Sequence, residues 1–175
     1  MSGQDYINSW NMQNKTQYLK RHVDYINKIL SSNQSYLCKG VSSVVRFKEN
    51  QFKKGMYEIK HEALFLKSED KIITPCIKIY ETWIDDKMVG YTYRFEIPYF
   101  EYCFACMGCD KKVQYKTFEF RYESHYDMPD HEPKDHLHIL DNVPPRYHTH
   151  RIEFENFINI IKRDFIKDDK VSFEY

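Results

Sequence analysis

The amino-acid sequence predicts an α+β fold, in which an antiparallel sheet of about six strands packs with an N-terminal and a C-terminal helix. Apolar residues near each end of the chain recur at helical spacing, whereas the middle alternates β-branched and aromatic residues with polar ones and is divided by short polar turns. A small open barrel is the alternative architecture. We expect residues 1–175 to form a single domain, because no internal repeat, low-complexity tract or Gly/Ser linker divides them.

The first helix is expected over about residues 14–31. Leu19, Val23, Ile26 and Leu30 follow one another at spacings of four, three and four, so they form one apolar stripe of an amphipathic helix. Most of the basic side chains of this segment fall outside the stripe and are expected on the exposed face.

The sheet is expected between about residues 36 and 122. The short turn Asp85-Asp86-Lys87 predicts a tight hairpin. In the last strand, Phe118 and Phe120 alternate with polar residues and are expected to face the core. The strands themselves are expected at residues 36–48, 56–66, 72–84, 88–97, 99–105 and 113–122.

A histidine-rich loop is expected over residues 123–150, because Pro, Asp and His replace the alternating pattern there. Ordered loops of this length are usually functional. The closing helix is expected over about residues 151–166, where Phe154, Phe157 and Ile161 have helical spacing. Acidic residues near its start and basic residues near its end match the helix macrodipole.

Charge and composition limit the classes of function. The chain carries 26 basic and 26 acidic residues, and this zero balance argues against a protein that coats duplex DNA through bulk electrostatics. No apolar run is long enough to cross a bilayer and no export signal opens the sequence, so we expect a soluble cytoplasmic protein without membrane contact.

The charge is nevertheless uneven along the chain. Residues 1–60 carry 10 basic and 4 acidic side chains, which could give the first helix a face that holds RNA or an acidic partner. A solvated helix face is the alternative interpretation. The candidate nucleic-acid-binding residues are Lys20, Arg21, Lys28 and Arg146.

The histidines form the first candidate site. Six of the eight histidines of the chain are clustered between residues 125 and 150. They are His125, His131, His136, His138, His148 and His150. On an extended backbone, the H-x-H spacing of two pairs projects both imidazoles to the same side. One imidazole could act as base and another as acid in metal-free RNA cleavage, with Arg121 or Arg146 stabilising the phosphorane charge.

Two alternatives remain open for the same histidines. They could bind Zn²⁺ or another transition metal together with a carboxylate, or they could cap turns and bind carboxylates in an exposed loop. The candidate catalytic residues are Arg121, His125, His131, His136 and His138.

The cysteines form the second candidate site. Cys103, Cys106 and Cys109 have C-x2-C-x2-C spacing, which could bind a metal such as Zn²⁺ with a fourth ligand. They could instead lie in a strand and turn, or form a redox-active thiol pair. Sequence motifs of phosphate-binding loops, dinucleotide-binding folds, α/β-hydrolases and zincin proteases are absent from the chain.

Residues 91–165 resemble the TumE-like family of small prokaryotic toxin-antitoxin toxins. The resemblance rests on a strand ending in FEFRYES, a Pro/His-rich loop with paired histidines and the closing helix IEFENFINIIKRDF. Arg121, Tyr122, His131, His136 and His138 stand at the positions of the family motif, although the loop is longer and the cysteines have no counterpart. The resemblance implies a toxin or defence-associated role with an antitoxin or effector partner.

The leading hypothesis is therefore a toxin-like or defence-associated protein that acts as an RNA-directed nuclease through histidine acid-base catalysis. The alternative is a non-enzymatic subunit that binds a protein partner or nucleic acid and carries a structural metal at the cysteines. A metal-dependent hydrolase with ligands from residues 123–150 is a third hypothesis.

Overall fold

A computed structural model describes residues 3–38, 44–70, 73–84, 86–102, 113–126, 128, 133–139 and 147–172. These residues form an α+β fold of two α-helices, a seven-stranded antiparallel sheet and a two-stranded hairpin. The elements are α1 (Gly3–Ser32), the short 3-10 helix η1 (Gln34–Tyr36), β1 (Phe47–Glu49), β2 (Met56–Phe65), β3 (Cys76–Ile84), β4 (Lys87–Tyr102), β5 (Val113–His125), β6 (Asp135–Ile139), β7 (Tyr147–His148), α2 (Phe154–Phe165), β8 (Ile166–Lys167) and β9 (Lys170–Val171).

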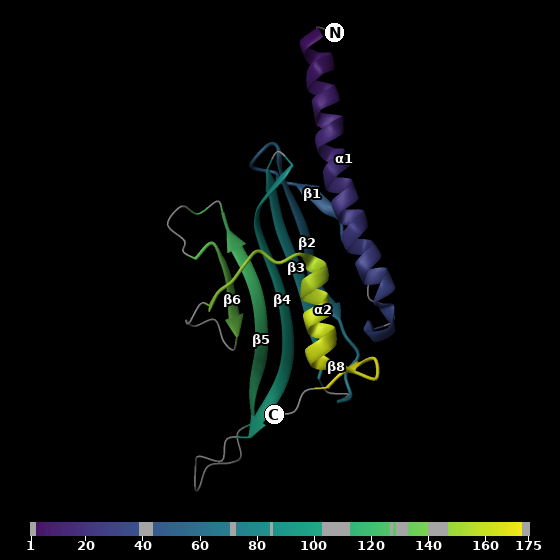
Figure 1. Ribbon diagram of the computed structural model, residues 1–175, viewed down its shortest axis with the longest axis vertical. Coiled ribbons are helices and arrows are strands. Elements are labelled where there is room, and N and C mark those ends of the chain that lie inside the picture. The colour runs from purple at the N-terminus through teal and green to yellow at the C-terminus, as the bar shows by residue number, and fades with distance from the viewer. Residues whose placement is uncertain are drawn as a thin grey trace.

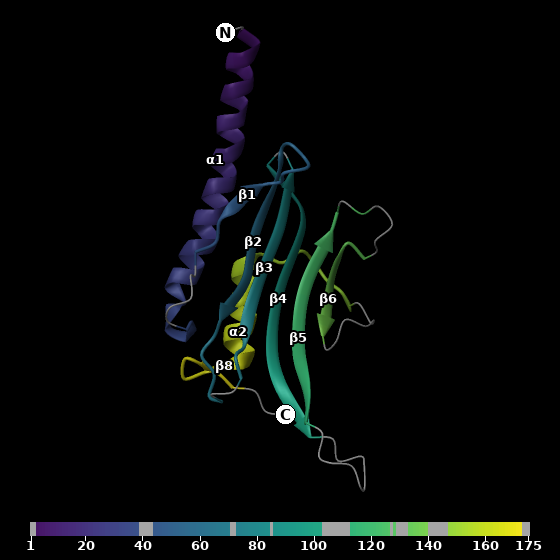
Figure 2. The same ribbon diagram turned by 180° about the vertical axis from the view of Figure 1, so that it is seen from behind.

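The large sheet is a meander. Its strands lie in the order β1 to β7, and each is antiparallel to its neighbours. Both α-helices lie against one face of this sheet (Figure 1), and the opposite face is turned toward the viewer in Figure 2. We call the first the helix face and the second the open face. The predicted fold class is confirmed, with a sheet that is larger than expected.

The core lies between the helix face and the two helices. Period-two alternation directs every second residue of β3, β4 and β5 toward the helices, as with Ile79, Phe95 and Phe120. Their apolar side chains meet the stripe of α1, and Phe157 of α2 stacks on the Phe120 ring. Phe118 packs against this core as well, so the predicted inward orientation of Phe118 and Phe120 is confirmed.

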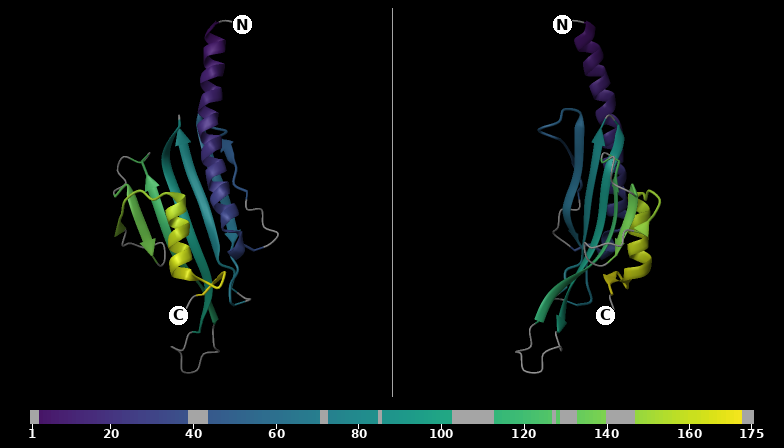
Figure 3. Two further views of the ribbon diagram at one scale, coloured as in Figure 1. Left: turned by 45° about the vertical axis from the view of Figure 1, so that its right-hand side comes forward. Right: turned by 90° about the vertical axis from the view of Figure 1, so that its left-hand side faces the viewer.

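Helix α1 begins earlier than the predicted residue 14. Its C-terminal half packs on the sheet through Leu19, Val23, Ile26 and Leu30, as the apolar stripe predicted. Its N-terminal part extends past the end of the sheet (Figure 3). A segment that does not pack on the sheet needs no apolar stripe, so the pattern marks only where the helix meets the core.

Among the described residues of the strand predicted over residues 36–48, Tyr36 belongs to η1 and the strand β1 begins only at Phe47. The side-chain amide of Asn27 donates to the Val45 carbonyl at 3.1 Å and accepts from the Val45 N–H at 2.8 Å. The two backbone groups that would continue the strand at Val45 are therefore bound to α1 instead.

The two strands predicted at 88–97 and 99–105 form one strand, β4, as far as Tyr102. Pro98 stands between the two predicted strands, and proline has no N–H for a ladder. Strand β3 pairs with β4 only as far as Glu96, so at Pro98 the described neighbour of β4 is β5. The missing N–H of Pro98 therefore interrupts no ladder with β3. The predicted hairpin between β3 and β4 is confirmed, with Asp86 at φ 67° in its turn.

The predicted loop over residues 123–150 is wrong in three places. Strand β5 continues to His125, and β6 and β7 extend the sheet beyond its predicted end at residue 122. Helix α2 agrees with the prediction, and its chain continues into the hairpin β8–β9, where Asp168 and Asp169 both have positive φ. Among the described residues, no helix combines the length and the apolar character needed to cross a membrane.

Candidate functional site

A row of polar side chains lies on the open face of β5. The aromatic residues of this strand face the helices, so Glu119, Arg121, Glu123 and His125 must face the other way. These side chains are far from fully exposed, because the Glu119 and Glu123 residues retain only 4% and 9% of their accessible surface. A charged row that is largely removed from water requires partners of opposite charge.

Strand β6 brings two histidines to this row. Its register places His136 directly opposite Glu123 and His138 opposite Arg121. Both imidazoles lie on the open face, which confirms that the H-x-H spacing projects them to the same side. His136 is completely buried and His138 retains 5% of its surface.

Three histidines converge on one carboxylate oxygen. The Nε2 atoms of His136 and His138 lie 2.9 and 2.8 Å from Oε1 of Glu123, and Nε2 of His125 lies 3.7 Å from it. One potential ligand atom from each of Glu123, His125 and His136 lies within 4.8 Å of the other two. This group of residues, together with His138, is called the Glu123 cluster below.

The two buried histidines present the same ring atom, Nε2, to Glu123 but differ at Nδ1. The Nδ1 atom of His136 lies 2.9 Å from the Pro133 carbonyl oxygen, which can only accept a hydrogen bond, so Nδ1 carries a proton. Nε2 of His136 in turn lies within hydrogen-bond distance of Oε1 of Glu123, which is also an atom that can only accept. In His138, Nδ1 is buried and finds no partner among the described residues, so its proton belongs on Nε2, which donates to Glu123.

The charge states follow from the surroundings. Burial raises the pKa of the Glu123 carboxyl, but Arg121 and the hydrogen bond with His136 outweigh burial, so the pKa lies below its ordinary value. Burial lowers the pKa of His138, and the positive charge of Arg121 lowers it further. At neutral pH the cluster therefore contains an ionised glutamate beside a neutral His138.

Arg121 is bound to carboxylates on both sides. Its Nε lies 3.3 Å from Oε1 of Glu119 and 3.3 Å from Oε2 of Glu123. The same alternation continues across β4 to β3, where Arg94 pairs with Glu119 and Glu96, and Lys78 pairs with Glu96. We call this row the charge ladder, and its members in order are Lys78, Glu96, Arg94, Glu119, Arg121 and Glu123.

The remaining predicted residues that the structure describes lie elsewhere. Lys20, Arg21 and Lys28 belong to α1, on the helix face, so the structure does not bring them to the Glu123 cluster. His148 lies opposite His136 in the sheet but is exposed, with its ring centroid 6.5 Å from that of His150.

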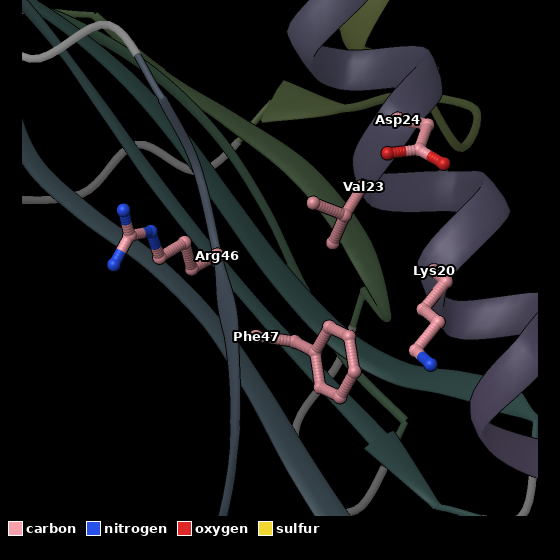
Figure 4. Close-up of a pocket in the computed structure, with 5 residues that line it drawn as sticks. All are labelled: Lys20, Val23, Asp24, Arg46 and Phe47. Atoms are coloured by element: carbon pink, nitrogen blue, oxygen red, sulfur yellow. The ribbon is translucent and has the colours of Figure 1, made fainter.

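Lys20 lines a separate cavity of about 360 Å³ between α1 and the segment leading into β1. Its other lining residues are Val23, Asp24, Arg46 and Phe47, and the Arg46 guanidinium points away from the Lys20 ammonium (Figure 4). Because β1 and β6 lie near opposite edges of the sheet, this cavity and the Glu123 cluster are separate sites.

Five predicted site residues fall outside the described residues. They are Cys103, Cys106, Cys109, His131 and Arg146. The predictions that the three cysteines bind a metal, that His131 takes part in catalysis and that Arg146 binds nucleic acid therefore remain predictions.

Sequence reasoning missed the central residue of the cluster. Glu123 was placed at the start of a loop, although the alternation of Glu119 and Arg121 continues through it to His125. Extending the two-residue period to the end of the strand would have placed all four side chains on one face.

A second buried carboxylate on the helix face was also missed. Glu81 of β3 has no exposed surface. It accepts hydrogen bonds from Trp83 Nε1 at 2.8 Å and from the Tyr93 hydroxyl at 2.6 Å, and His22 Nε2 lies 2.8 Å from its Oε2. We call these four residues the Glu81 network. It joins α1 to two central strands.

No family model, curated protein or solved structure matches this chain. The resemblance of residues 91–165 to the TumE-like family therefore remains a prediction, and the functional argument rests on the geometry of the Glu123 cluster.

Proposed function

We propose that the protein is a metal-dependent hydrolase. Its metal ion, for which Zn²⁺ is the first candidate, would be bound by Glu123, His125 and His136. Two imidazoles and one carboxylate are a ligand set of known catalytic zinc sites, in which water occupies the fourth position. His125 retains 25% of its side-chain surface, so the cluster is reached from solvent on this side.

The single observation that carries the proposal is the orientation of the His136 ring. A histidine that binds a metal through one nitrogen usually donates its other N–H to a carbonyl or carboxylate. His136 has this arrangement, because Nδ1 donates to the Pro133 carbonyl while Nε2 faces Oε1 of Glu123 at 2.9 Å. Without a metal, Nε2 at this distance hydrogen-bonds to the carboxylate oxygen, and a bound cation would take the place of the shared proton.

The chemistry follows from the ligand set. Zn²⁺ with three protein ligands lowers the pKa of its bound water to about 7, so hydroxide becomes available as a nucleophile at neutral pH. In this centre Glu123 would supply negative charge, His136 would fix the position of the ion, and the exposed side of His125 would leave the fourth position open to water and substrate.

Metal content measured by elemental analysis tests the binding step. We expect a stoichiometric ion in the purified protein, retained in Cys106→Ser and lost in Glu123→Gln and in His136→Asn. Glu62→Gln is the matched control, because Glu62 is an exposed acid of β2 that pairs only with Lys60 in the described structure. An ion lost with Cys106→Ser and kept in Glu123→Gln would contradict the proposal.

Hydrolysis of phosphodiester, phosphomonoester and carboxylic ester probes tests the catalytic step. We expect activity toward at least one class to disappear with a chelator, to return with Zn²⁺ and to be absent in Glu123→Gln. Activity that survives both chelation and Glu123→Gln would contradict a metal-dependent mechanism.

Metal-free RNA cleavage by histidines is the second candidate function. The observation that favours it is the neutral His138, whose Nε2 donates to Glu123 and whose Nδ1 keeps a lone pair that can accept a proton. That Nδ1 atom is buried, however, so a 2′-hydroxyl would reach it only after the site had opened. Against it, the charge of Arg121 is already met by two carboxylates. RNA cleavage in the presence of a chelator, abolished by His136→Ala with His138→Ala, would favour this candidate.

A toxin-like role can be tested independently of the chemistry. We expect expression in a bacterial host to arrest growth if the protein is a toxin, and the same His136→Ala, His138→Ala variant to relieve the arrest. Unimpaired growth with abundant folded wild-type protein would argue against this role.

A further inference from the structure

We propose that Arg121 is a positioning residue that restricts Glu123 to one ligating oxygen, and that it thereby selects a four-coordinate ion such as Zn²⁺ over Mn²⁺. This inference rests on the proposed function, because it concerns the metal ion that the Glu123 cluster would bind.

The two oxygens of Glu123 have different surroundings. Oε2 is paired with Nε of Arg121 at 3.3 Å, whereas Oε1 faces Nε2 of His136 at 2.9 Å and that of His138 at 2.8 Å. Only Oε1 is directed at the histidines. A metal bound among them would therefore meet one carboxylate oxygen.

The charge ladder prevents Arg121 from releasing Oε2. The Arg121 side chain retains 15% of its accessible surface, and its guanidinium also pairs with Glu119, whose side chain retains 6%. Glu119 is in turn bound by Arg94, which is held by Glu96. Movement of Arg121 would leave a largely buried carboxylate without its counter-charge, and this is energetically unfavourable.

The number of carboxylate oxygens influences which ion fits. Zn²⁺ favours tetrahedral sites with nitrogen ligands and single oxygens, whereas Mn²⁺ suits octahedral sites that are rich in carboxylate oxygen and water. A carboxylate that can offer only one oxygen therefore favours Zn²⁺. Without Arg121, Oε2 would become free and Glu123 could bind through both oxygens.

The test compares dissociation constants for Zn²⁺ and Mn²⁺ in the full chain. Removing Arg121 also removes a positive charge near the ion, but both ions carry the same charge, so this effect cancels in the ratio of the two constants. We expect Arg121→Met to reduce the preference for Zn²⁺ over Mn²⁺ by about tenfold, in the range known for residues that orient metal ligands.

Lys60→Met is the control. It removes one positive charge from an exposed pair with Glu62 on β2, outside the charge ladder, so the preference should stay as in the wild type. Co²⁺ provides a second measurement. Its visible absorption should weaken in Arg121→Met, because four-coordinate Co²⁺ absorbs more strongly than Co²⁺ of higher coordination number, and should stay unchanged in Lys60→Met.

The outcomes separate the two proposals. The proposed metal site is overturned if the wild-type protein binds neither ion. It is also overturned if the Glu123→Gln variant binds both ions as tightly as the wild type does. Binding that depends on Glu123, with the same preference and Co²⁺ spectrum in Arg121→Met as in wild type, overturns the assignment of Arg121 alone. If Arg121→Met fails to fold, Arg121→Lys decides, because an ammonium lacks the planar fork of guanidinium and should shift the preference in the same direction.

Discussion

Among the described residues, Glu81 and Glu123 are two charged side chains that are buried and surrounded by several partners. Glu81 and Glu123 lie on opposite faces of the sheet, and both are nearly removed from water. Glu81 accepts hydrogen bonds from Trp83 and Tyr93 and lies against His22, whereas histidines and Arg121 surround Glu123. In the Glu123 cluster, one ligand atom each of Glu123, His125 and His136 lies within 4.8 Å of the other two, which is the arrangement that the proposed metal ion would need.

The Glu81 network should contribute to stability. We expect Glu81→Gln to lower the free energy of unfolding by about 2 kcal/mol or more, because an amide nitrogen would meet donors in a site without water. Urea unfolding followed by circular dichroism measures this loss. Glu62→Gln, the same change at an exposed position, should leave stability unchanged. Equal stability of the two variants would show that the Glu81 network is dispensable.

Cys76 should be an unreactive thiol. Burial, followed by the charge of Glu96, raises the pKa of Cys76 to about 11. At pH 8 only about one molecule in a thousand would then carry the reactive thiolate. Native wild type and Cys76→Ala should therefore show the same number of rapidly modified thiols with a disulfide reagent at pH 8, and differ by one after unfolding. A rapidly reacting thiol lost with Cys76→Ala would contradict this expectation.

At the scale of elements, α2 packs on strands β4 and β5 through aromatic contacts. The Phe157 ring lies with its centroid 5.7 Å from that of Tyr93, 6.1 Å from that of Phe120 and 6.4 Å from that of Tyr122. These partners belong to β4 and β5, so one side chain of α2 spans the strand pair that carries Glu123.

Loss of this side chain should be costly. We expect Phe157→Ala to lower the free energy of unfolding by about 3 to 5 kcal/mol, the range for removing a buried aromatic ring. Asn159→Ala, at an exposed position of the same helix, should change it by less than about 0.5 kcal/mol. Chemical unfolding curves of both variants would reveal the difference, and a loss below about 1 kcal/mol at Phe157 would show that α2 packs loosely.

Elements with a one-sided apolar pattern were predictable from the sequence. Helix α2 and strand β2 lie close to their expected bounds, because their buried faces impose a period of 3.6 or 2 on the sequence. Strand β6 was not predicted, because its buried positions include His136 and His138. A strand whose most deeply buried residues are histidines has the composition of a loop.

The candidate site was predictable in its residue types but not in its geometry. The H-x-H spacing correctly indicated that His136 and His138 share a side. The acidic partner could not be identified, because Glu123 reaches them only through the pairing of β5 with β6, which depends on a strand that was read as a loop. Register between distant strands is fixed by tertiary contacts rather than by local pattern.

At the scale of the whole molecule, the sheet separates an apolar side from a charged side. The two helices cover one face of the sheet and leave the other open (Figures 1 and 2). The apolar core lies on the helix face, and the charge ladder and the Glu123 cluster lie on the open face. The ligands come from β5 and β6, which are adjacent strands of the large sheet. A metal ion bound there should therefore stabilise the folded chain as a whole, since the unfolded chain does not hold these residues together.

We expect this linkage to appear as a shift in thermal unfolding. Free Zn²⁺ at a hundred times its dissociation constant adds about 2.7 kcal/mol to stability, which for a chain of this size raises the Tm by roughly 5 to 10 °C. Differential scanning fluorimetry with Zn²⁺ and then with excess chelator should show the rise and its reversal. The shift should be absent in Glu123→Gln and present in Cys106→Ser and Glu62→Gln. A shift that persists in Glu123→Gln but disappears in Cys106→Ser would place the stabilising ion at the cysteines, which would make the metal structural and leave the Glu123 cluster to metal-free chemistry.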